Sequence, residues 1–133
     1  LSWGEQPRTK KEENNNTVKI STGLSLGSGK RNTASIVAVG RGEESAAKRC
    51  DDLVVHNGGQ VFDDWFLPSS METLYIKSNL YNSKIGGIYR SWYWTSTETH
   101  DYWDRILAFD YSHTDYVPVH SGGRFRIRAA RMY

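Results

Sequence analysis

The sequence of 133 residues contains one cysteine and three prolines, and its net charge is small. The single thiol, Cys50, excludes an internal disulfide and leaves a cysteine-based metal site without enough ligands. The 17 basic and 15 acidic residues give a formal net charge of +2, which argues against an electrostatic nucleic-acid binder. No apolar run approaches the roughly 18 residues that a membrane span needs. We therefore expect neither a nucleic-acid partner nor a membrane span.

Aromatic residues are what the chain has in abundance: they make up 13% of it, including five Trp and eight Tyr. This supply of core-forming side chains is typical of a folded domain rather than a disordered chain. The length predicts a single domain over residues 1–133. Its first part, residues 1–22, is a polar N-terminal segment. No signal peptide is visible and the chain begins with Leu1, so we expect a processed or excised chain with an upstream part.

Two segments have the pattern of amphipathic helices. In the first, apolar residues recur at helical spacing, and Asn57-Gly58-Gly59 is expected to end the helix. These residues are Ala46, Ala47, Cys50, Leu53 and Val54. On this stripe Cys50 is expected to be a small buried hydrophobe rather than a reactive thiol.

The second helical segment follows a short predicted strand, residues 65–67. Ser69 and Glu72 have the spacing of a capping box, and Met71, Leu74 and Tyr75 would form the inner face. The secondary structure of residues 33–39, TASIVAV, is ambiguous. The β-branched run favours a strand, whereas Thr33 could cap a short helix.

Strands are predicted in the second half of the chain, at residues 91–98, 103–111 and 123–133. In the last of these, Phe125, Ile127 and Ala129 alternate with Arg124, Arg126 and Arg128, which predicts one buried and one cationic face. Helices followed by an antiparallel sheet indicate the α+β class.

We find no catalytic constellation in the sequence and expect neither an enzyme nor a cofactor. Three histidines, His100, His113 and His120, lie close to several aspartates, including Asp101, Asp104, Asp110 and Asp115. Their spacings fit no known metal-binding pattern, so we expect no metal site.

Residues 99–123 have an unusual composition. They contain no Lys, Glu, Gln or Met, whereas 17 of the preceding 98 residues are of these types. Tyr, His, Asp, Ser and Thr take their place, which is close to the composition of antibody paratopes. We expect Trp103 and Phe109 to be buried, and Tyr102, Tyr111 and Tyr116 to be exposed.

Several motifs together resemble a known family. The segments DDWFLPSSMETL, WYWTSTE and RIRAARMY are similar to the bacterial C-type lectin-like domain, which occurs at the C-terminus of collagen-like adhesins and in variable proteins of diversity-generating retroelements. The similarity spans roughly residues 23–133. It implies a C-type lectin-like fold, with two helices packed on a twisted antiparallel sheet with long loops.

The resemblance also implies a function. Retroelement mutagenesis of Asn codons at adenines cannot produce Lys, Glu, Gln, Met or Trp, which matches the composition of residues 99–123. The chain would be a diversified receptor for a macromolecular ligand, and a protein is the ligand class we favour. We expect it on a bacterial or phage surface, or otherwise outside the cytoplasm. The positions carried over as variable and ligand-binding are His100, Asp101, Tyr102, Asp104, Arg105, Asp110, Tyr111, His113, Thr114, Asp115, Tyr116, His120 and Ser121.

The sequence departs from the pattern of this family in three respects. The Glu-Pro-Asn and Trp-Asn-Asp motifs of calcium-dependent lectins are missing, and the formylglycine-generating enzymes of the same fold need paired cysteines, whereas Cys50 is alone. Without an upstream partner strand, the C-terminal strand would keep an open edge. As an alternative function, Arg124, Arg126 and Arg128 could bind an anionic polysaccharide, as in an adhesive domain.

Overall fold

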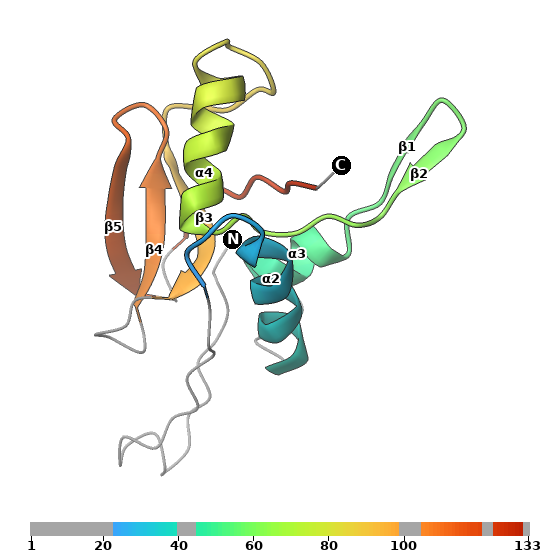
Figure 1. Ribbon diagram of the computed structural model, residues 1–133, viewed down its shortest axis with the longest axis horizontal. Coiled ribbons are helices and arrows are strands. Elements are labelled where there is room, and N and C mark those ends of the chain that lie inside the picture. The colour runs from blue at the N-terminus through green and yellow to red at the C-terminus, as the bar shows by residue number, and fades with distance from the viewer. Residues whose placement is uncertain (1–22, 40–44, 99–104, 121–123, 132–133) are drawn as a thin grey trace.

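The computed structural model describes residues 23–39, 45–98, 105–120 and 124–131. These residues form three α-helices and two antiparallel sheets, which confirms the α+β class. The prediction of two helices was wrong, because the ambiguous stretch at residues 33–39 belongs to a third. Figure 1 shows the larger sheet on one side of the molecule, with a small two-stranded hairpin projecting from the other side.

Helix α2 spans Ser28–Val39. Its β-branched residues are helical because tertiary contacts outweigh their strand propensity. Ile36 is completely buried in the core. The Thr33 hydroxyl donates a hydrogen bond to the Gly29 carbonyl (2.8 Å) and accepts one from the Leu67 N–H (2.9 Å), so Thr33 lies within the helix instead of capping it.

Helix α3 spans Ala46–Asp51 and is capped by Ser45, whose side chain accepts from the Lys48 N–H. Ala46, Ala47 and Cys50 are buried as expected. The helix ends earlier than the pattern indicated, and Leu53 and Val54 are exposed.

The Asn-Gly-Gly sequence, which we expected to end this helix, instead forms the turn of the projecting hairpin. Its strands are β1 (Val55–Asn57) and β2 (Gln60–Phe62). Both turn glycines have positive φ, 59° at Gly58 and 83° at Gly59, as a two-residue hairpin turn requires.

Helix α4 spans Ser70–Ile76 and continues into a π-helical turn, η1, at Lys77–Tyr81. The predicted capping box between Ser69 and Glu72 is present. Of the predicted inner face, Leu74 packs against the cluster of Tyr93, Phe109 and Tyr111, whereas Met71 and Tyr75 are exposed and that part of the prediction was wrong. The buried position in the middle of α4 is Thr73, whose hydroxyl lies 3.0 Å from the Tyr116 hydroxyl of the sheet. Apolar periodicity does not reveal such a polar contact.

The larger sheet has the order β3–β4–β5, with strands Trp92–Glu98, Arg105–Asp110 and Asp115–His120. The first two agree with predicted strands, and β5 was not predicted. Pro118 lies in β5 and cannot donate to a ladder; it is accommodated because β5 pairs only with β4 among the described strands.

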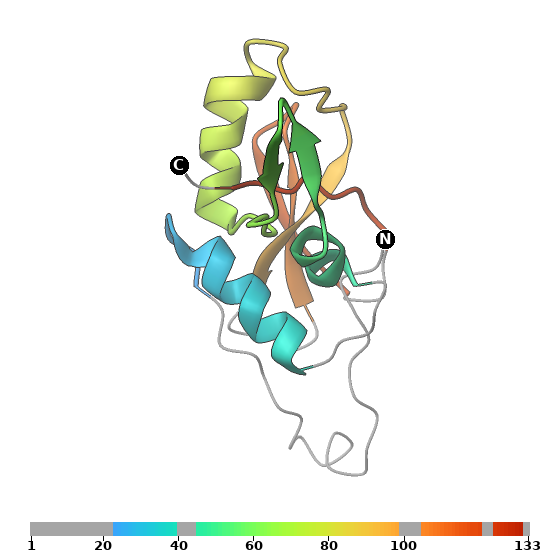
Figure 2. The same cartoon turned by 90° about the vertical axis from the view of Figure 1, so that its right-hand side faces the viewer.

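Two hydrophobic clusters cover the two faces of this sheet. Ile106 belongs to the cluster that contains α2, α3 and Trp94, whereas Phe109 belongs to the cluster that contains Tyr93 and Tyr111. Because side chains alternate along a strand, these two residues of β4 point to opposite faces. Figure 2 shows α2 and α3 on the near side of the molecule, below the projecting hairpin.

The C-terminal segment, residues 124–131, is not a regular strand, so that prediction was wrong. It makes isolated bridges with two different partners instead of one continuous ladder: Arg126 pairs with Tyr93 of β3, and Ala130 pairs with Phe66. The backbone hydrogen bonds at these bridges are 2.8–3.2 Å long. The segment is therefore held between β3 and the Phe66 backbone.

Candidate binding surface at the end of the β4–β5 hairpin

The turn between β4 and β5 is held by one aspartate. The Asp110 carboxylate accepts hydrogen bonds from the Ser112 backbone N–H (2.9 Å) and hydroxyl (2.7 Å), and lies 2.7 Å from the His113 imidazole. Burial by itself would raise the pKa of Asp110. The hydrogen bonds from Ser112 and the contact with His113 outweigh it and hold that pKa below its usual value. The turn is thus fixed around an ionised carboxylate.

Three consecutive residues of this turn point to solvent: His113, Thr114 and Asp115 are all exposed. Thr114 has a φ of 55°, an unusual backbone conformation for a β-branched residue. The side chains present an imidazole, a hydroxyl and a carboxylate on a short, preformed loop. This arrangement offers both donors and acceptors to a ligand at low ordering cost.

Aromatic rings form a rigid platform beneath the turn. Tyr111 packs edge-on against Tyr93 and Phe109, with ring centroids 5.1 Å and 4.8 Å apart, and it stacks on Tyr81 at 6.1 Å. Phe109 also contacts Tyr116 at 4.6 Å. Edge-to-face aromatic pairs of this kind contribute about 0.5–1.5 kcal/mol beyond their buried area. The exposed turn therefore rests on a cluster of buried aromatic rings.

The expected exposure of Tyr111 was wrong, since only 1% of it is accessible. Burial raises the pKa of its phenol well above the ordinary value. The physical reason is that Tyr111, directly after β4, turns back onto the Tyr93–Phe109 pair, which the polar neighbours in the sequence do not reveal. Phe109 is buried, as predicted.

Tyr116 was also expected to be exposed, and it is half-buried. Its hydroxyl donates to the Ser70 carbonyl and contacts the Thr73 hydroxyl, so the side chain connects β5 to α4. Burial raises its pKa, and the hydrogen bond with Thr73 only partly offsets this effect. Tyr116 thus has a structural role in the described fold, with only part of its ring available to a ligand.

The predicted binding residues do not all meet at one place. Arg105 and His120 pair with each other at the far end of the β4–β5 hairpin from the Asp110–Asp115 pair. Five residue steps at about 3.4 Å each separate the two ends by roughly 17 Å. The remaining candidates lie outside the described residues: His100, Asp101, Tyr102, Asp104 and Ser121, with the expected core residue Trp103.

The three arginines of the C-terminal segment differ in their exposure and in their neighbours. Arg124 and Arg126 are exposed, and the Arg126 guanidinium lies 4.6 Å from the centre of the Tyr89 ring. Arg128 is partly buried, with its guanidinium beside Gly86. Two of the three therefore approach the loop at residues 84–90, which the sequence pattern did not connect with them.

Cys50 is buried, as predicted, and burial followed by the charge of Asp51 raises the pKa of its thiol to about 12. Within the described residues, no three His, Cys, Asp or Glu side chains come together in a way that could hold a metal ion. In the same part of the chain, no helix is long and apolar enough to cross a bilayer.

Tyr81 belongs to this surface although it was not among the predicted site residues. It lies in η1 and stacks on Tyr111, which places it beside the hairpin turn (Figure 1). A π-helical turn shifts the helical spacing, so periodicity gave no signal. The sequence signal for Tyr81 as a site residue was an aromatic side chain close to two cations, Lys77 and Lys84.

Comparisons of the chain with protein-family models, with curated proteins and with solved structures gave no match.

Proposed function

We propose that this chain is a ligand-binding domain of C-type lectin-like fold, whose recognition surface includes the exposed turn of the β4–β5 hairpin. The observation that carries the proposal is the position of His113, Thr114 and Asp115 on a turn fixed by Asp110 and backed by buried aromatic rings. Exposed residues on a rigid support can change without unfolding the domain. This is the property that a diversified receptor needs.

A protein is the ligand class that we favour. A specific protein interface buries about 800 Å² on each partner, more than three turn residues provide. The neighbouring surface extends from the turn toward Tyr81 and the loop that follows it, at the same end of the molecule in both views (Figures 1 and 2). A protein ligand that covers both parts would reach this area.

The structure narrows the set of residues that we propose to vary. Tyr111 is removed from it, because a core position does not tolerate free substitution. His113, Thr114 and Asp115 remain as the described positions at which substitution would alter the surface and preserve the platform.

Deep sequencing of this locus from independent isolates of the source population tests the proposal. Diversification predicts amino-acid changes concentrated at His113, Thr114 and Asp115 and at the predicted variable positions outside the described residues, each explained by an adenine in a nearby template copy. Tyr93 and Phe109 serve as internal controls and should be invariant. Substitutions spread evenly over the gene, or no template copy, would contradict diversification.

Binding is tested separately with a surface-displayed library randomised at the same three positions. Most members should fold, and selection against a panel of unrelated proteins should recover binders. A library randomised at Tyr93, Phe109 and Tyr111 is the matched control and should mostly fail to fold. If both libraries fold equally poorly, the turn is not a display surface.

A further inference from the structure

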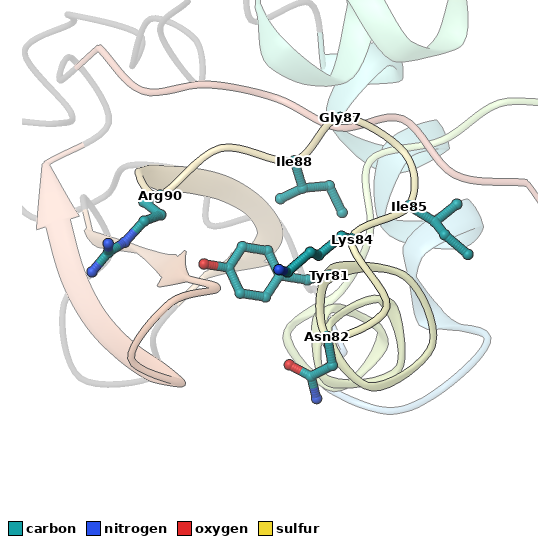
Figure 3. Close-up of a pocket in the computed structure, with 7 residues that line it drawn as sticks. All are labelled: Tyr81, Asn82, Lys84, Ile85, Gly87, Ile88 and Arg90. Carbon is teal, nitrogen blue, oxygen red and sulfur yellow. The ribbon is translucent and has the colours of Figure 1, made fainter.

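A pocket lies between η1 and the start of β3, at the same end of the molecule as the hairpin turn. Its volume is about 400 Å³, within the range of roughly 300–1,000 Å³ that is usual for small-ligand sites. Figure 3 shows its seven lining residues, which come from the end of η1 and from the loop that connects it to β3: Tyr81, Asn82, Lys84, Ile85, Gly87, Ile88 and Arg90.

The walls of this pocket are held in place by the core. Tyr81 and Ile88 pack against the cluster of Tyr93, Phe109 and Tyr111, so one side of the pocket continues into buried structure. The loop between them reverses its direction through left-handed backbone conformations at Lys84 (φ 58°), Gly86 (φ 90°) and Gly87 (φ 64°). The side of the pocket that Tyr81 and Ile88 form is therefore fixed by the core.

The charged residues that line the pocket are all positive. Lys84 and Arg90 are its only charged lining residues, and no lining residue is acidic. Over the described ranges, neither cation forms an ion pair. Elsewhere Lys48 is paired with Asp52 and Arg131 with Asp64, each at 2.7 Å. The carboxylate at the neighbouring hairpin turn, Asp110, is already occupied by Ser112 and His113.

Two further cations reach the same loop from the C-terminal segment. The Arg128 guanidinium lies beside Gly86, 3.1 Å from the position that a side-chain carbon would take there. Arg126 stacks on Tyr89, whose N–H donates to the Tyr93 hydroxyl at 2.9 Å. The fold thus brings four cationic residues around one loop, and in the part of the chain that is described none of them is neutralised by a carboxylate.

We propose that this pocket binds a small organic anion, in which a carboxylate on a six-membered ring lies between Lys84 and Arg90. The ring would contact Tyr81 and Ile88, and the carboxylate would accept hydrogen bonds from the Lys84 ammonium. Figure 3 shows the exposed Arg90 side chain pointing away from Lys84, so its guanidinium would turn toward the carboxylate when the ligand binds. At roughly 30 Å³ per water-sized group, the volume limits the ligand to about a dozen non-hydrogen atoms. The pocket lies in the loop beside the hairpin turn, within the wider surface proposed above for a protein ligand, but binding of a small anion there does not depend on the function proposed for the turn.

Titration of the full chain with benzoate and with glucuronate, followed by NMR chemical-shift changes, tests the proposal. The two probes distinguish an aromatic acid from a sugar acid, and benzamide and glucose are their uncharged counterparts. We expect at least one acid to saturate with shifts confined to residues 81–90 and its uncharged counterpart to bind at least about fivefold more weakly, the upper range for one solvent-exposed ion pair.

Variants then assign the contact. Lys84→Gln and Arg90→Gln should each weaken binding of the acid by about fivefold, and the double variant should abolish detectable shifts. Lys30→Gln removes one charge from α2, which begins at the other end of α4, and should leave binding unchanged. His113→Ala should also leave it unchanged, which separates this site from the hairpin turn.

Three results would overturn the proposal. These are no saturable shift with either acid, equal binding of the acids and their uncharged counterparts, and undiminished binding by the double variant with a native spectrum.

Discussion

The carboxylate of Glu72 accepts a hydrogen bond from the backbone N–H of Gly29, 43 residues earlier in the chain, at 3.0 Å. The same carboxylate accepts from the N–H of Gly27 (3.1 Å) and of Ser69 (2.7 Å). One side chain therefore satisfies backbone donors at the N-termini of both α2 and α4, where the helix dipoles favour a negative charge. It thereby links the N-terminal ends of these two helices.

Replacement of Glu72 by Ala should destabilise the domain by about 2–3 kcal/mol, because it removes charge-assisted bonds at two helix ends. Glu72→Gln retains one acceptor oxygen and should cost less. Urea unfolding followed by circular dichroism measures both variants. If Glu72→Ala costs no more than about 0.5 kcal/mol, as an ordinary surface change does, the carboxylate does not join the helices.

Gly29 lies within α2, where Ala normally stabilises a helix by about 1 kcal/mol relative to Gly. Here a side-chain carbon would lie 2.9 Å from the Leu67 carbonyl oxygen and 2.8 Å from the Phe66 ring. Gly29→Ala should therefore destabilise the protein, by about 1–3 kcal/mol. Ala34→Gly, at an exposed position of the same helix, is the reference and should cost about 1 kcal/mol. A rise in melting temperature of Gly29→Ala would contradict the close packing.

The hairpin turn and its platform should respond differently to truncation. Tyr111→Ala should cost about 3–5 kcal/mol, since it leaves a cavity among Tyr93, Phe109 and Tyr81. His113→Ala removes an exposed side chain and should change stability by no more than about 1 kcal/mol. Thermal melts of the two variants provide the comparison, and equal losses would show that the turn is part of the core.

The lowered pKa of Asp110 predicts a dependence of stability on acid pH. A carboxyl whose folded pKa lies below its unfolded value of about 3.9 stabilises the fold fully above that value. This stabilisation is lost as the pH falls through the folded pKa. Unfolding free energies measured from pH 7 down to pH 2.5 should therefore decline less in Asp110→Asn than in the wild type. Parallel curves would remove Asp110 as a source of acid sensitivity.

Cys50 should be unreactive in the folded protein. With the thiol buried and its pKa raised to about 12, almost no accessible thiolate exists at pH 8. Iodoacetamide should modify it slowly in buffer and rapidly in denaturant, which mass spectrometry measures. Rapid stoichiometric modification of the native protein would show that α3 opens or that the thiol is accessible.

The sequence by itself determined the features that depend on local spacing. The Ser69–Glu72 capping box, the buried Cys50 stripe of α3 and the strands around Trp94 and Phe109 were all predicted from sequence patterns that span a few residues. The α+β class follows from the order of these elements. Local chemistry also predicted a polar turn region, and His113, Thr114 and Asp115 are exposed there.

Only the tertiary structure decided the features that depend on distant partners. Residues 33–39 became helical because Thr33 bonds to Leu67, and Tyr111 became core because β4 carries it onto Tyr93. The C-terminal segment lost its strand character because it divides its hydrogen bonds between β3 and Phe66. The tertiary structure also brings Arg126 and Arg128 beside the loop at residues 84–90. Periodicity reports which face of a segment is apolar, whereas the identity of the partner on that face is fixed only when the chain closes on itself.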